Sequence, residues 1–394
     1  MVALRFPDVD DTRRHRERAL EQVLGARFLG GNDVRVLKNG VEIFPAMLAA
    51  IEAAETSIAF VTFVYWQGEI AERFANALAD AARRGVDVMV VLDAVGASDM
   101  SDALVALLED AGADVRWFRP KATWRVWRTS HRTHRKLLIV DHDVGFTGGV
   151  GIAEEWTGDA RSPDEWRDTH LEIRGPAVRN LWGAFAGNWI EMTADLPARW
   201  DDARPCDPIP GSDERVLIVR STASIGWSET ASMFRTLLAL AKRRVWAATP
   251  YFVPDDKTVE QLCRLAMDGA DVRILLPGEH IDQTAVRLAS ERTMGALLEA
   301  GVRIHEYDPT MMHAKVLIVD DDLACVGSAN MNQRSLRKDD EVSAVLSSPR
   351  LVELLGDHFM ADLDRSTERS LQGWREAWWR RALGALLAPF RTEM

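Results

Sequence analysis

The sequence predicts an α/β fold of two similar halves, each a mixed sheet flanked by helices, packed together as a pseudo-dimer. The main observation is an internal repeat: ARRGVDVMVVLD at residues 82–93 returns as AMDGADVRILLP at 266–277. A second pair follows, LLEDAGADVRWFRP at 107–120 and LLEAGVRIHEYDP at 297–309. Each segment has the pattern of a helix end, a capping glycine and a strand buried on both faces. This repeat favours duplication of one α/β unit.

The other elements alternate in the same way along the chain. Apolar runs predict strands, and apolar positions that recur at helical spacing predict amphipathic helices. A charged segment predicts an N-terminal helix over residues 10–29, and the Pro- and Asp-rich stretch 199–215 predicts a linker. The expected strands include 57–66 and 244–252, and the expected helices include 71–84 and 258–269.

These signals divide the chain into five parts. The parts are an N-terminal helical extension (1–32), a first half (33–198), the linker (199–215), a second half (216–365) and a C-terminal amphipathic segment (366–394). With 394 residues, 47% of them hydrophobic, the chain is long enough for two such halves around a substantial core.

The composition excludes several classes of protein. Three widely spaced cysteines are too few for a disulfide framework or a cysteine metal site, which indicates a reducing compartment. The N-terminus lacks an apolar signal core, and no apolar run is long enough to cross a bilayer, so we expect a cytoplasmic protein. The net charge of -12 opposes general binding to nucleic acid or anionic lipid, so any contact with phosphate requires a local basic patch.

The first chemical signal is the stretch THRKLLIVDHDVGFTGG, residues 133–149. His134 and Lys136 stand two residues apart at the start of an apolar strand. Alternate side chains of a strand share a face, so both groups can enter one cavity. Asp141 follows at the far end of the same strand.

The second half repeats this arrangement in MHAKVLIVDDDLACVGSANMNQRS, residues 312–335. His313, Lys315 and Asp320 have the spacing of the first copy. If the halves pack as a pseudo-dimer, the two strand starts face each other. Both imidazoles and both ammonium groups then enter one cleft.

Such a cleft suits a phosphodiester. Lys136 and Lys315 would neutralise the non-bridging oxygens and the charge that develops on five-coordinate phosphorus, and Ser328 and Asn330 would add directed hydrogen bonds. One imidazole can attack phosphorus while the other protonates the leaving oxygen and then deprotonates a second substrate. Histidine suits both roles because its pKa lies near neutrality.

With both motifs in view, the sequence resembles the phospholipase D superfamily, whose members carry two His-Lys-Asp motifs, and within it the bacterial cardiolipin synthase group. Supporting stretches are RTHRKLLIVD, EWRDTHLEIRGPAV, TPYFVPDD and GSANMNQRS. The resemblance implies the phospholipase D fold, His134 as the nucleophile, and His313 as the general acid and then base. The catalytic set that it implies is His134, Lys136, Asp141, His313, Lys315 and Asp320.

Two further carboxylates follow the motifs at comparable distances. Asp168 and Glu341 lie on expected strands, and each is expected to accept the Nδ1 hydrogen of a catalytic histidine and leave Nε2 aimed at phosphorus. Asp141 and Asp320 lie at the far ends of their strands, so from position alone we expect them to fix the following turn.

The two copies differ after the strand pair. The first copy has Gly149 and Gly151 where the second has Ser328 and Asn330. Backbone N–H groups are the candidate substitutes for the missing side-chain donors.

No cofactor is expected, and no metal. His131, His142 and His170 lie near the first motif, but their spacing is not typical of a zinc site, and a phosphohistidine route needs no metal.

A basic and aromatic stretch, residues 118–136, precedes the first motif. We interpret it as a loop at the mouth of the cleft, where arginines bind lipid phosphate and tryptophans sit at headgroup level. Stacking on single-stranded nucleic acid and packing of the tryptophans on the core are the alternatives. The contact residues are Trp124, Arg125, Trp127 and Arg128, and the other basic residues are Arg119, Lys121, Arg132 and Arg135.

The C-terminal segment SLQGWREAWWRRALGALLAPF, residues 370–390, is amphipathic at helical spacing. It is too short and too charged to span a bilayer, so we interpret it as a helix lying in the interface. Trp374, Trp378 and Trp379 are its expected headgroup contacts. The alternative is a terminal helix that covers an apolar face of its own domain.

The favoured function is a phosphatidyl transferase that forms a phosphohistidine intermediate, as in cardiolipin synthases. The alternatives are a hydrolytic phospholipase D, a nuclease-like phosphodiesterase and a noncatalytic scaffold that binds anionic lipid. The expected partners are phospholipids, phosphatidylglycerol or phosphatidylethanolamine, with no nucleic acid. The expected location is cytoplasmic, peripherally bound to the inner face of the cell membrane.

Overall fold

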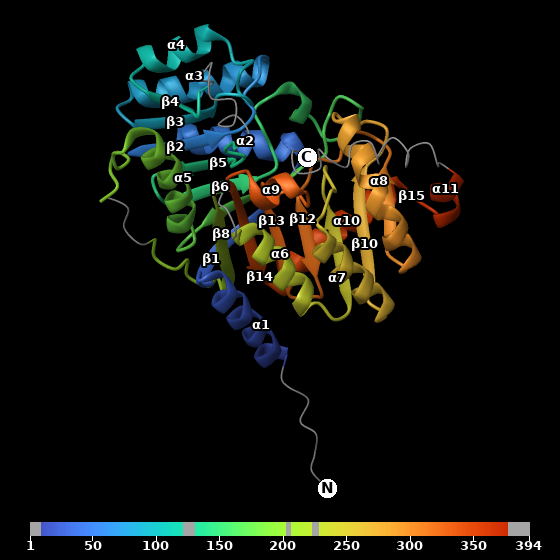
Figure 1. Ribbon diagram of the computed structural model, residues 1–394. Helices are drawn as coiled ribbons and strands as arrows, with labels where there is room; N and C mark the ends of the chain where they lie inside the picture. The colour runs from blue at the N-terminus through green and yellow to red at the C-terminus, as the bar shows by residue number, and fades with distance from the viewer. Residues whose placement is uncertain (1–8, 121–130, 202–205, 223–227, 377–394) are drawn as a thin grey trace.

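The computed structural model describes residues 9–120, 131–201, 206–222 and 228–376. Two α/β halves lie side by side, the first in blue to green and the second in yellow to red (Figure 1). The first half contains β1 (Leu29–Lys38), α2 (Asn39–Glu52), β2 (Ser57–Thr62), α3 (Glu69–Arg83), β3 (Asp87–Asp93), α4 (Asp102–Asp110), β4 (Asp114–Phe118), β5 (Leu137–Val140), β6 (Val144–Gly148), the short 3₁₀ helix η2 (Glu154–Trp156), β7 (Thr169–Arg174) and α5 (Val178–Thr193).

The second half repeats nearly the same order of elements, as the internal repeat predicts. It contains β8 (Glu214–Ser221), α6 (Glu229–Leu240), β9 (Arg244–Ala248), α7 (Asp256–Met267), β10 (Asp271–Pro277), α8 (Thr284–Glu299), β11 (Arg303–Tyr307), β12 (Val316–Val319), β13 (Leu323–Gly327), α9 (Gln333–Arg337), β14 (Glu341–Ser347), α10 (Pro349–Leu363) and β15 (Ser366–Glu368). Helices α1 (Val9–Leu24) and α11 (Leu371–Glu376) lie at the two ends of the described chain.

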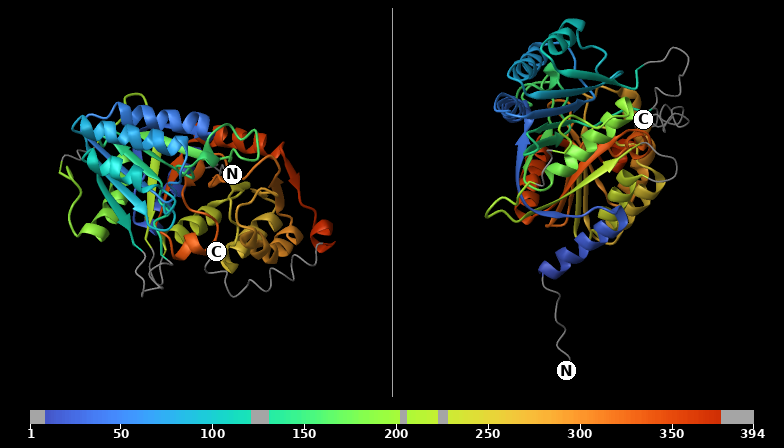
Figure 2. Two further views of the ribbon diagram at one scale, coloured as in Figure 1. Left: turned by 90° about the horizontal axis from the view of Figure 1, so that it is seen from above. Right: turned by 90° about the vertical axis from the view of Figure 1, so that its left-hand side faces the viewer.

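Each half has a mixed sheet. Strands β2, β3 and β4 run parallel in the first half, as do β9, β10 and β11 in the second. All other pairings of the named strands, within and between the halves, are antiparallel. Strand β1 pairs with both β7 and β8, so the described strands form one sheet of 15 that crosses from one half to the other. Helices cover its faces (Figure 2).

The repeated glycines have the conformation that the repeat predicts. Gly85 and Gly269 follow α3 and α7 with φ of 92° and 95°, a region that favours glycine over any residue with a Cβ atom. Both turns lead into parallel strands whose apolar residues are buried, β3 and β10. The same local signal therefore ends a helix and starts a buried strand in each half.

The largest hydrophobic cluster joins the halves. It combines Leu171 and Phe185 of the first half with Ile318 and Ala344 of the second, all at most 1% exposed. Two further clusters lie within the individual halves. Because the shared cluster is apolar and buried, it fixes the halves against each other and thereby fixes the strand ends that carry the motifs.

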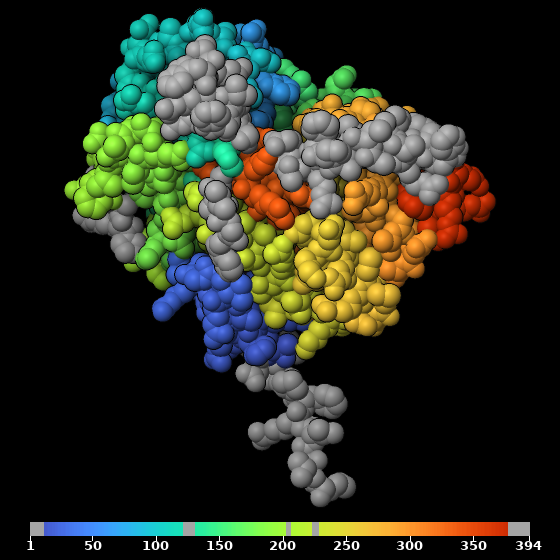
Figure 3. Space-filling view, viewed as in Figure 1, coloured from blue at the N-terminus to red at the C-terminus, as the bar shows by residue number. Residues whose placement is uncertain are grey.

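The N-terminal boundary differs from the expectation. Helix α1 ends at Leu24, not at residue 29, because Gly25 takes a positive φ of 64°. Strand β1 begins at Leu29, inside the range expected for the extension. Helix α1 itself packs on α6, and its blue surface adjoins the yellow surface of the second half (Figure 3). Arg16 of α1 forms a buried ion pair with Asp320 of the second half.

The C-terminal boundary also differs. Strand β15 pairs with β11 at the edge of the sheet, so residues 366–368 of the expected C-terminal segment belong to the second half. The helix expected over residues 370–390 is described only as α11, since residues 377–394 lie outside the described chain.

Candidate functional site

The two histidines lie just before equivalent strands. His134 precedes β5 and His313 precedes β12, and each strand turns back as a β-hairpin with its neighbour, β6 or β13. All four residues of β5 and of β12 are buried. The apolar residues after each motif therefore anchor the histidine and lysine at a fixed edge of the sheet.

Main-chain hydrogen bonds tie each histidine segment to the opposite half. The His134 N–H donates to Asp340 O at 2.9 Å, and the Asp340 N–H donates to Arg132 O at 2.9 Å. In the second copy, the His313 N–H donates to Arg167 O at 2.8 Å. Each motif is thus held by the segment just before a carboxylate of the other half.

As a result, the histidine–carboxylate pairs are crossed between the halves. His134 Nδ1 lies 3.0 Å from Glu341 Oε1, and His313 Nδ1 lies 2.7 Å from Asp168 Oδ2. Both carboxylates are fully buried. These contacts orient the rings and leave Nε2 as the reactive nitrogen of each imidazole. The sequence indicated these four residues but not which half supplies each partner.

Each carboxylate has a second donor, and the two donors differ. The Ser328 hydroxyl donates to Glu341 Oε2 and accepts from the Val342 N–H at 3.0 Å. In the first half, the indole N–H of Trp156 donates to Asp168 Oδ2 at 2.9 Å. Trp156 was not predicted from the sequence, because its position in η2 has no counterpart in the spacing of the repeat.

The expected phosphate contact of Ser328 is wrong, because its hydroxyl is completely buried behind Glu341. In the first copy, the Gly149 N–H is engaged elsewhere, since it donates to Thr169 O in the sheet. The Gly151 N–H stays a candidate donor. A Cβ atom at Gly149 would lie 2.2 Å from Asp168 Oδ1, so the Asp168 carboxylate occupies the space that a side chain would need.

The lysines bring positive charge into the buried site. Lys136 Nζ donates to His134 O at 3.0 Å, and Lys315 Nζ lies 3.0 Å from His313 Nε2. Burial lowers the pKa of Lys136 to about 8 and that of Lys315 to about 7. Because burial disfavours the charged form of each lysine, a bound anion that restores this charge is favoured.

The imidazole pKa values are also lowered. Burial, followed by the charge of Lys315, lowers the pKa of His313 to about 3, and burial lowers the pKa of His134. Both rings are therefore neutral at pH 7 in the empty site, which suits a nucleophile. A bound anionic phosphodiester favours the charged form of a nearby imidazole, so substrate binding supplies the condition for a general acid.

Most of these groups face one cavity of about 370 Å³, but Lys315 is not among its lining residues and instead lines a smaller pocket beside β12. Both histidines, Lys136 and Asn330 line the larger cavity, so Asn330 is placed where an amide could reach a phosphate. The other lining residues are Phe63, Val64, Trp66, Val95, Arg132, Trp156, Trp166, Tyr251, Asp282, Gln283, Val286, Asn332, Arg334 and Asp339. The cavity has the size and mixed polarity of a small-molecule site.

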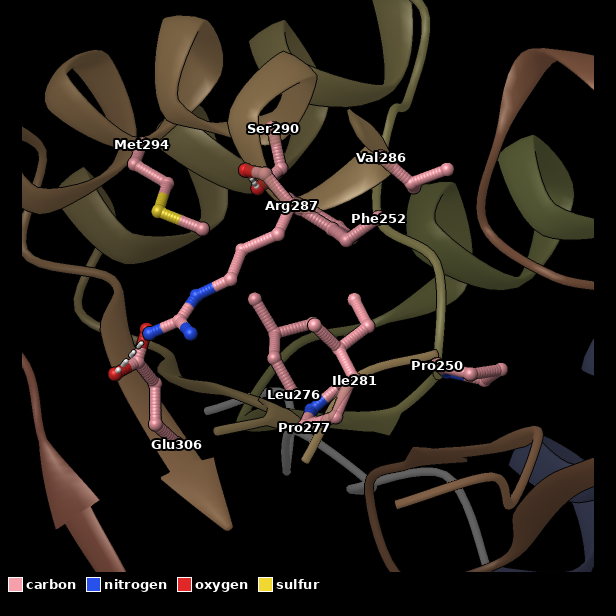
Figure 4. Close-up of a pocket in the computed structure, with 10 residues that line it drawn as sticks. All are labelled: Pro250, Phe252, Leu276, Pro277, Ile281, Val286, Arg287, Ser290, Met294 and Glu306. Atoms are coloured by element: carbon pink, nitrogen blue, oxygen red, sulfur yellow. Dashed lines mark hydrogen bonds and ion pairs between the residues drawn. The ribbon is translucent and has the colours of Figure 1, made fainter. Parts of the chain in front are cut away.

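A smaller apolar pocket adjoins this cavity at Val286 (Figure 4). Leu276, Pro277 and Met294 are among its walls. Its volume of about 10 Å³ is enough for one water molecule and too small for a lipid chain.

Asp141 and Asp320 do not belong to this site. Asp141 accepts hydrogen bonds from the N–H groups of residues 55–57 at 2.7 to 2.9 Å, and Asp320 accepts from those of residues 242–244 at 2.7 to 3.2 Å. They were expected as members of the catalytic set or as supports of the following turn. They instead hold the loops that lead into β2 and β9, at the far ends of β5 and β12.

Two arginines expected to bind lipid phosphate are structural. Arg132 donates from Nε to both carboxylate oxygens of Asp93 at 2.9 and 3.0 Å, and Arg135 donates to Ala184 O at 2.7 Å. Both are 1% exposed. These hydrogen bonds fix the segment that leads to His134. Arg135 therefore cannot reach a lipid surface, and the donors of Arg132 are engaged within the protein.

The expected membrane contacts fall mostly outside the described residues. This applies to Trp124, Arg125, Trp127, Arg128, Trp378 and Trp379. Trp374 is described, and its indole N–H donates to Glu291 O on α8 at 3.2 Å while its ring packs over Gly295. These contacts favour the alternative, a terminal helix that packs on its own domain, while headgroup contact by the half-buried Trp374 stays a prediction.

The remaining histidines are dispersed. His131 Nδ1 lies 3.0 Å from Lys338 O, the His142 ring packs edge-on against Trp182, and His170 is buried in β7, where burial lowers its pKa to about 4. Among the described residues, no three His, Cys, Asp or Glu side chains are grouped to hold a metal ion. In the same part of the chain, no helix has the length and apolarity to cross a membrane.

Comparisons with known proteins agree with this arrangement. The family model described as cardiolipin synthase, PLD-like domain, matches residues 47–160 and 234–363, and so covers both motifs. A cardiolipin synthase of Alkalihalophilus pseudofirmus is 33% identical over 338 residues, which are 86% of this chain and 67% of that protein. One of Listeria innocua is 32% identical over 371 residues, 93% of this chain and 77% of that protein.

Solved structures support the fold. The crystal structure of phosphatidylserine synthase from Haemophilus influenzae matches with a TM-score of 0.72 at 14% identity, over 96% of this chain and all of that chain. Polyphosphate kinase from Porphyromonas gingivalis matches with a TM-score of 0.57 at 14% identity, over 86% of this chain and 49% of that chain. Together with the family model and the relatives, the duplicated motif establishes that the chain belongs to the phospholipase D-like family of cardiolipin synthases.

Proposed function

We propose that the protein is a phosphatidyltransferase that forms cardiolipin from phospholipids, with phosphatidylglycerol as the donor and the acceptor. One observation carries the proposal: two imidazoles, each oriented by a carboxylate of the opposite half, line one cavity with Lys136 and Asn330. Family membership gives the reaction class, since the relatives are named cardiolipin synthases.

In the first step, His134 Nε2 attacks phosphorus and a P–N bond forms. The P–O bond to the headgroup breaks, and the leaving oxygen takes a proton from His313. In the second step, His313 removes a proton from the acceptor hydroxyl, whose oxygen attacks phosphorus and breaks the P–N bond. The products are cardiolipin and glycerol, and both histidines return to their starting states.

The surrounding groups have separate tasks in this mechanism. Lys136 and Lys315 stabilise the charge on the non-bridging oxygens, and the Asn330 amide adds a directed donor. Glu341 and Asp168 hold the Nδ1 hydrogens of His134 and His313 and stabilise the cation that forms on each ring. Ser328 and Trp156 keep these carboxylates in place.

The proposal also includes peripheral binding to the inner face of the cell membrane, where the phospholipids lie. Residues 124–128 (WRVWR) and 378–381 (WWRR) combine tryptophan with arginine, and this composition suits contact with lipid headgroups. Binding of the purified protein to anionic vesicles, compared with a variant in which Trp124 and Trp127 are alanine, tests this part.

The decisive experiment is incubation of the purified protein with phosphatidylglycerol, followed by mass analysis of lipids and of released glycerol. Cardiolipin and glycerol in equal amounts are the expected products. Phosphatidic acid without cardiolipin would identify a hydrolase and refute transfer to lipid. A parallel incubation with phosphatidylethanolamine and glycerol tests the alternative donor.

A further inference from the structure

One side of the catalytic cavity carries a preformed polar cluster that the steps above do not use. Tyr251 lies in the loop after β9, and Asp282 and Gln283 lie just before α8. The Tyr251 hydroxyl donates to Asp282 Oδ2 at 2.6 Å and accepts from Gln283 Nε2 at 3.1 Å. All three residues line the cavity that contains both catalytic histidines.

This cluster lies beside His313 rather than beside His134. The Tyr251 ring is 6.5 Å from the His313 ring, centroid to centroid, and nearly perpendicular to it at 86°. Trp156 and Trp166 flank the same imidazole at 5.0 and 5.3 Å. The approach to His313 is therefore bounded by aromatic rings and by the cluster.

The free groups of the cluster are hydrogen-bond acceptors. Within the described part of the chain, Asp282 Oδ1 and Gln283 Oε1 have no donor, while both residues are open to the cavity. Tyr251 is 9% exposed, and burial together with the charge of Asp282 raises its pKa, so its hydroxyl keeps the proton that it donates to Asp282. A carboxylate and an amide oxygen held in this way match the hydroxyl groups of an alcohol and repel a phosphate.

We infer that Tyr251, Asp282 and Gln283 form the subsite for the leaving and entering alcohol, and that they bind a polyol through the hydroxyls that do not react. The inference rests on the proposed transfer, with His313 as the group that protonates and deprotonates the reacting oxygen. A reacting hydroxyl at His313 and a neighbouring hydroxyl at Asp282 suit a glycerol unit, whose hydroxyls lie on adjacent carbons. Tyr251 acts as a positioning residue, since it fixes the carboxylate.

The test compares two acceptors of similar size, deuterated glycerol and 1-propanol, with unlabelled short-chain phosphatidylglycerol as the soluble donor. The label is needed because transfer to glycerol regenerates phosphatidylglycerol, and mass analysis then counts the deuterated product. The wild type should prefer glycerol, measured as the ratio of the two kcat/KM values. Asp282→Asn and Asp282→Ala should lower this ratio by about ten- to hundredfold, since one hydrogen bond to a charged group is lost. Tyr251→Phe should change the ratio in the same direction by a smaller factor. Asp268→Asn, at an exposed turn outside the cavity, is the matched control.

An unchanged ratio in the Asp282 and Tyr251 variants, with thermal unfolding like that of the wild type, overturns the inference. So does a preference for ethanolamine over glycerol that disappears with Asp282, because the carboxylate would then bind an ammonium group. If the wild type only hydrolyses phosphatidylglycerol, the proposed transfer fails, but the leaving alcohol is still glycerol. In that case the kcat/KM ratio for hydrolysis of phosphatidylglycerol over phosphatidylpropanol, in wild type and Asp282→Asn, decides the inference.

Discussion

His313 of the second half and Asp168 of the first half are hydrogen-bonded at 2.7 Å, although they are 145 residues apart in the chain. The equivalent contact between His134 and Glu341 runs in the opposite direction across the same boundary. The cavity that both histidines line is consequently a property of the paired halves.

The two histidines should be separable by the leaving group. We expect His134→Ala to abolish covalent labelling of the protein by a phosphodiester substrate, because it removes the nucleophile. We expect His313→Ala to lower turnover of phosphatidylglycerol by about 10²- to 10⁴-fold, the usual contribution of a general acid. With a p-nitrophenyl phosphodiester, whose leaving group needs no proton, His313→Ala should still form acid-labile phosphohistidine. Labelling that persists in His134→Ala and disappears in His313→Ala would reverse the two roles.

Trp156 should influence the protonation of His313 through Asp168. Its indole N–H and the His313 ring share one oxygen of the Asp168 carboxylate. Without the indole donor in Trp156→Phe, that oxygen interacts more strongly with a protonated imidazole, which should raise the pKa of His313. The pH profile of kcat should shift to higher pH, with a loss of about tenfold in kcat as is typical for groups behind a catalytic residue. Trp117→Phe, in β4, controls for the loss of an indole. If both variants leave the profile unshifted, Trp156 has only a packing role.

Anion binding should be coupled to protonation of the lysines. Burial lowers the pKa values of Lys136 and Lys315 to about 8 and about 7, so at pH 8.5 the empty site holds mostly neutral amines. Inorganic phosphate favours the ammonium forms, and its binding should therefore take up protons and weaken as the pH rises. Calorimetry in buffers of different ionisation enthalpy measures this uptake. Proton release at pH 8.5 would contradict the prediction.

The same lysines affect stability in the empty protein. Their pKa values lie below the ordinary value of 10.5, so the folded protein binds fewer protons than the unfolded chain between about pH 7 and pH 10.5. Their contribution to the free energy of unfolding should therefore rise with pH in this window. Urea unfolding at several pH values, in wild type and in Lys136→Met and Lys315→Met, isolates this contribution, because each variant removes one titrating group.

Asp320 should matter for stability and not for chemistry. Its carboxylate accepts three main-chain hydrogen bonds and pairs with Arg16, so Asp320→Ala removes the acceptor of these N–H groups and leaves Arg16 with Asp322 as its remaining carboxylate partner. We expect a loss of about 1 to 3 kcal/mol in the free energy of unfolding, since hydrogen bonds to a charged group are lost. The kcat of the folded variant at low temperature should equal that of the wild type. A variant that folds normally but has lost its turnover would return Asp320 to the catalytic set.

Chelators should leave most of the activity intact. Lys136 and Lys315 supply the positive charge at phosphorus that a metal ion supplies in other phosphodiesterases. Activity on short-chain phosphatidylglycerol with and without EDTA measures this, since a soluble substrate removes effects of divalent ions on anionic bilayers. Complete loss with EDTA, restored by stoichiometric zinc, would contradict the prediction.

The sequence was sufficient to predict the halves because their signals are local. Gly85 and Gly269 end helices and precede buried strands, and this pattern repeats in the chain without reference to anything distant. The spacing of His134 and Lys136 likewise fixes a shared strand face. Such features depend on backbone periodicity, so they can be read from one sequence.

The hydrogen bonds around the motifs join segments that are distant in the chain. No local pattern of residues indicates which of these segments meet. Ser328 follows a motif and has a hydroxyl, so phosphate binding was a reasonable prediction, but the hairpin directs it to Glu341. In the first half, Trp156 donates the corresponding hydrogen bond to Asp168 from the short helix η2, whose sequence has no periodic pattern. Arg132 and Arg135 were interpreted as surface cations because nothing local indicates their buried partners.

The crossed contacts have a consequence for synthesis of the chain on the ribosome. His134 can be oriented by its partner only after residue 341 has been synthesised, whereas Asp168, the partner of His313, precedes that histidine in the chain. A partly made chain therefore contains the first histidine and lysine without an oriented nucleophile. A product that ends before Glu341 therefore lacks the carboxylate that orients His134, even though it contains the complete first motif.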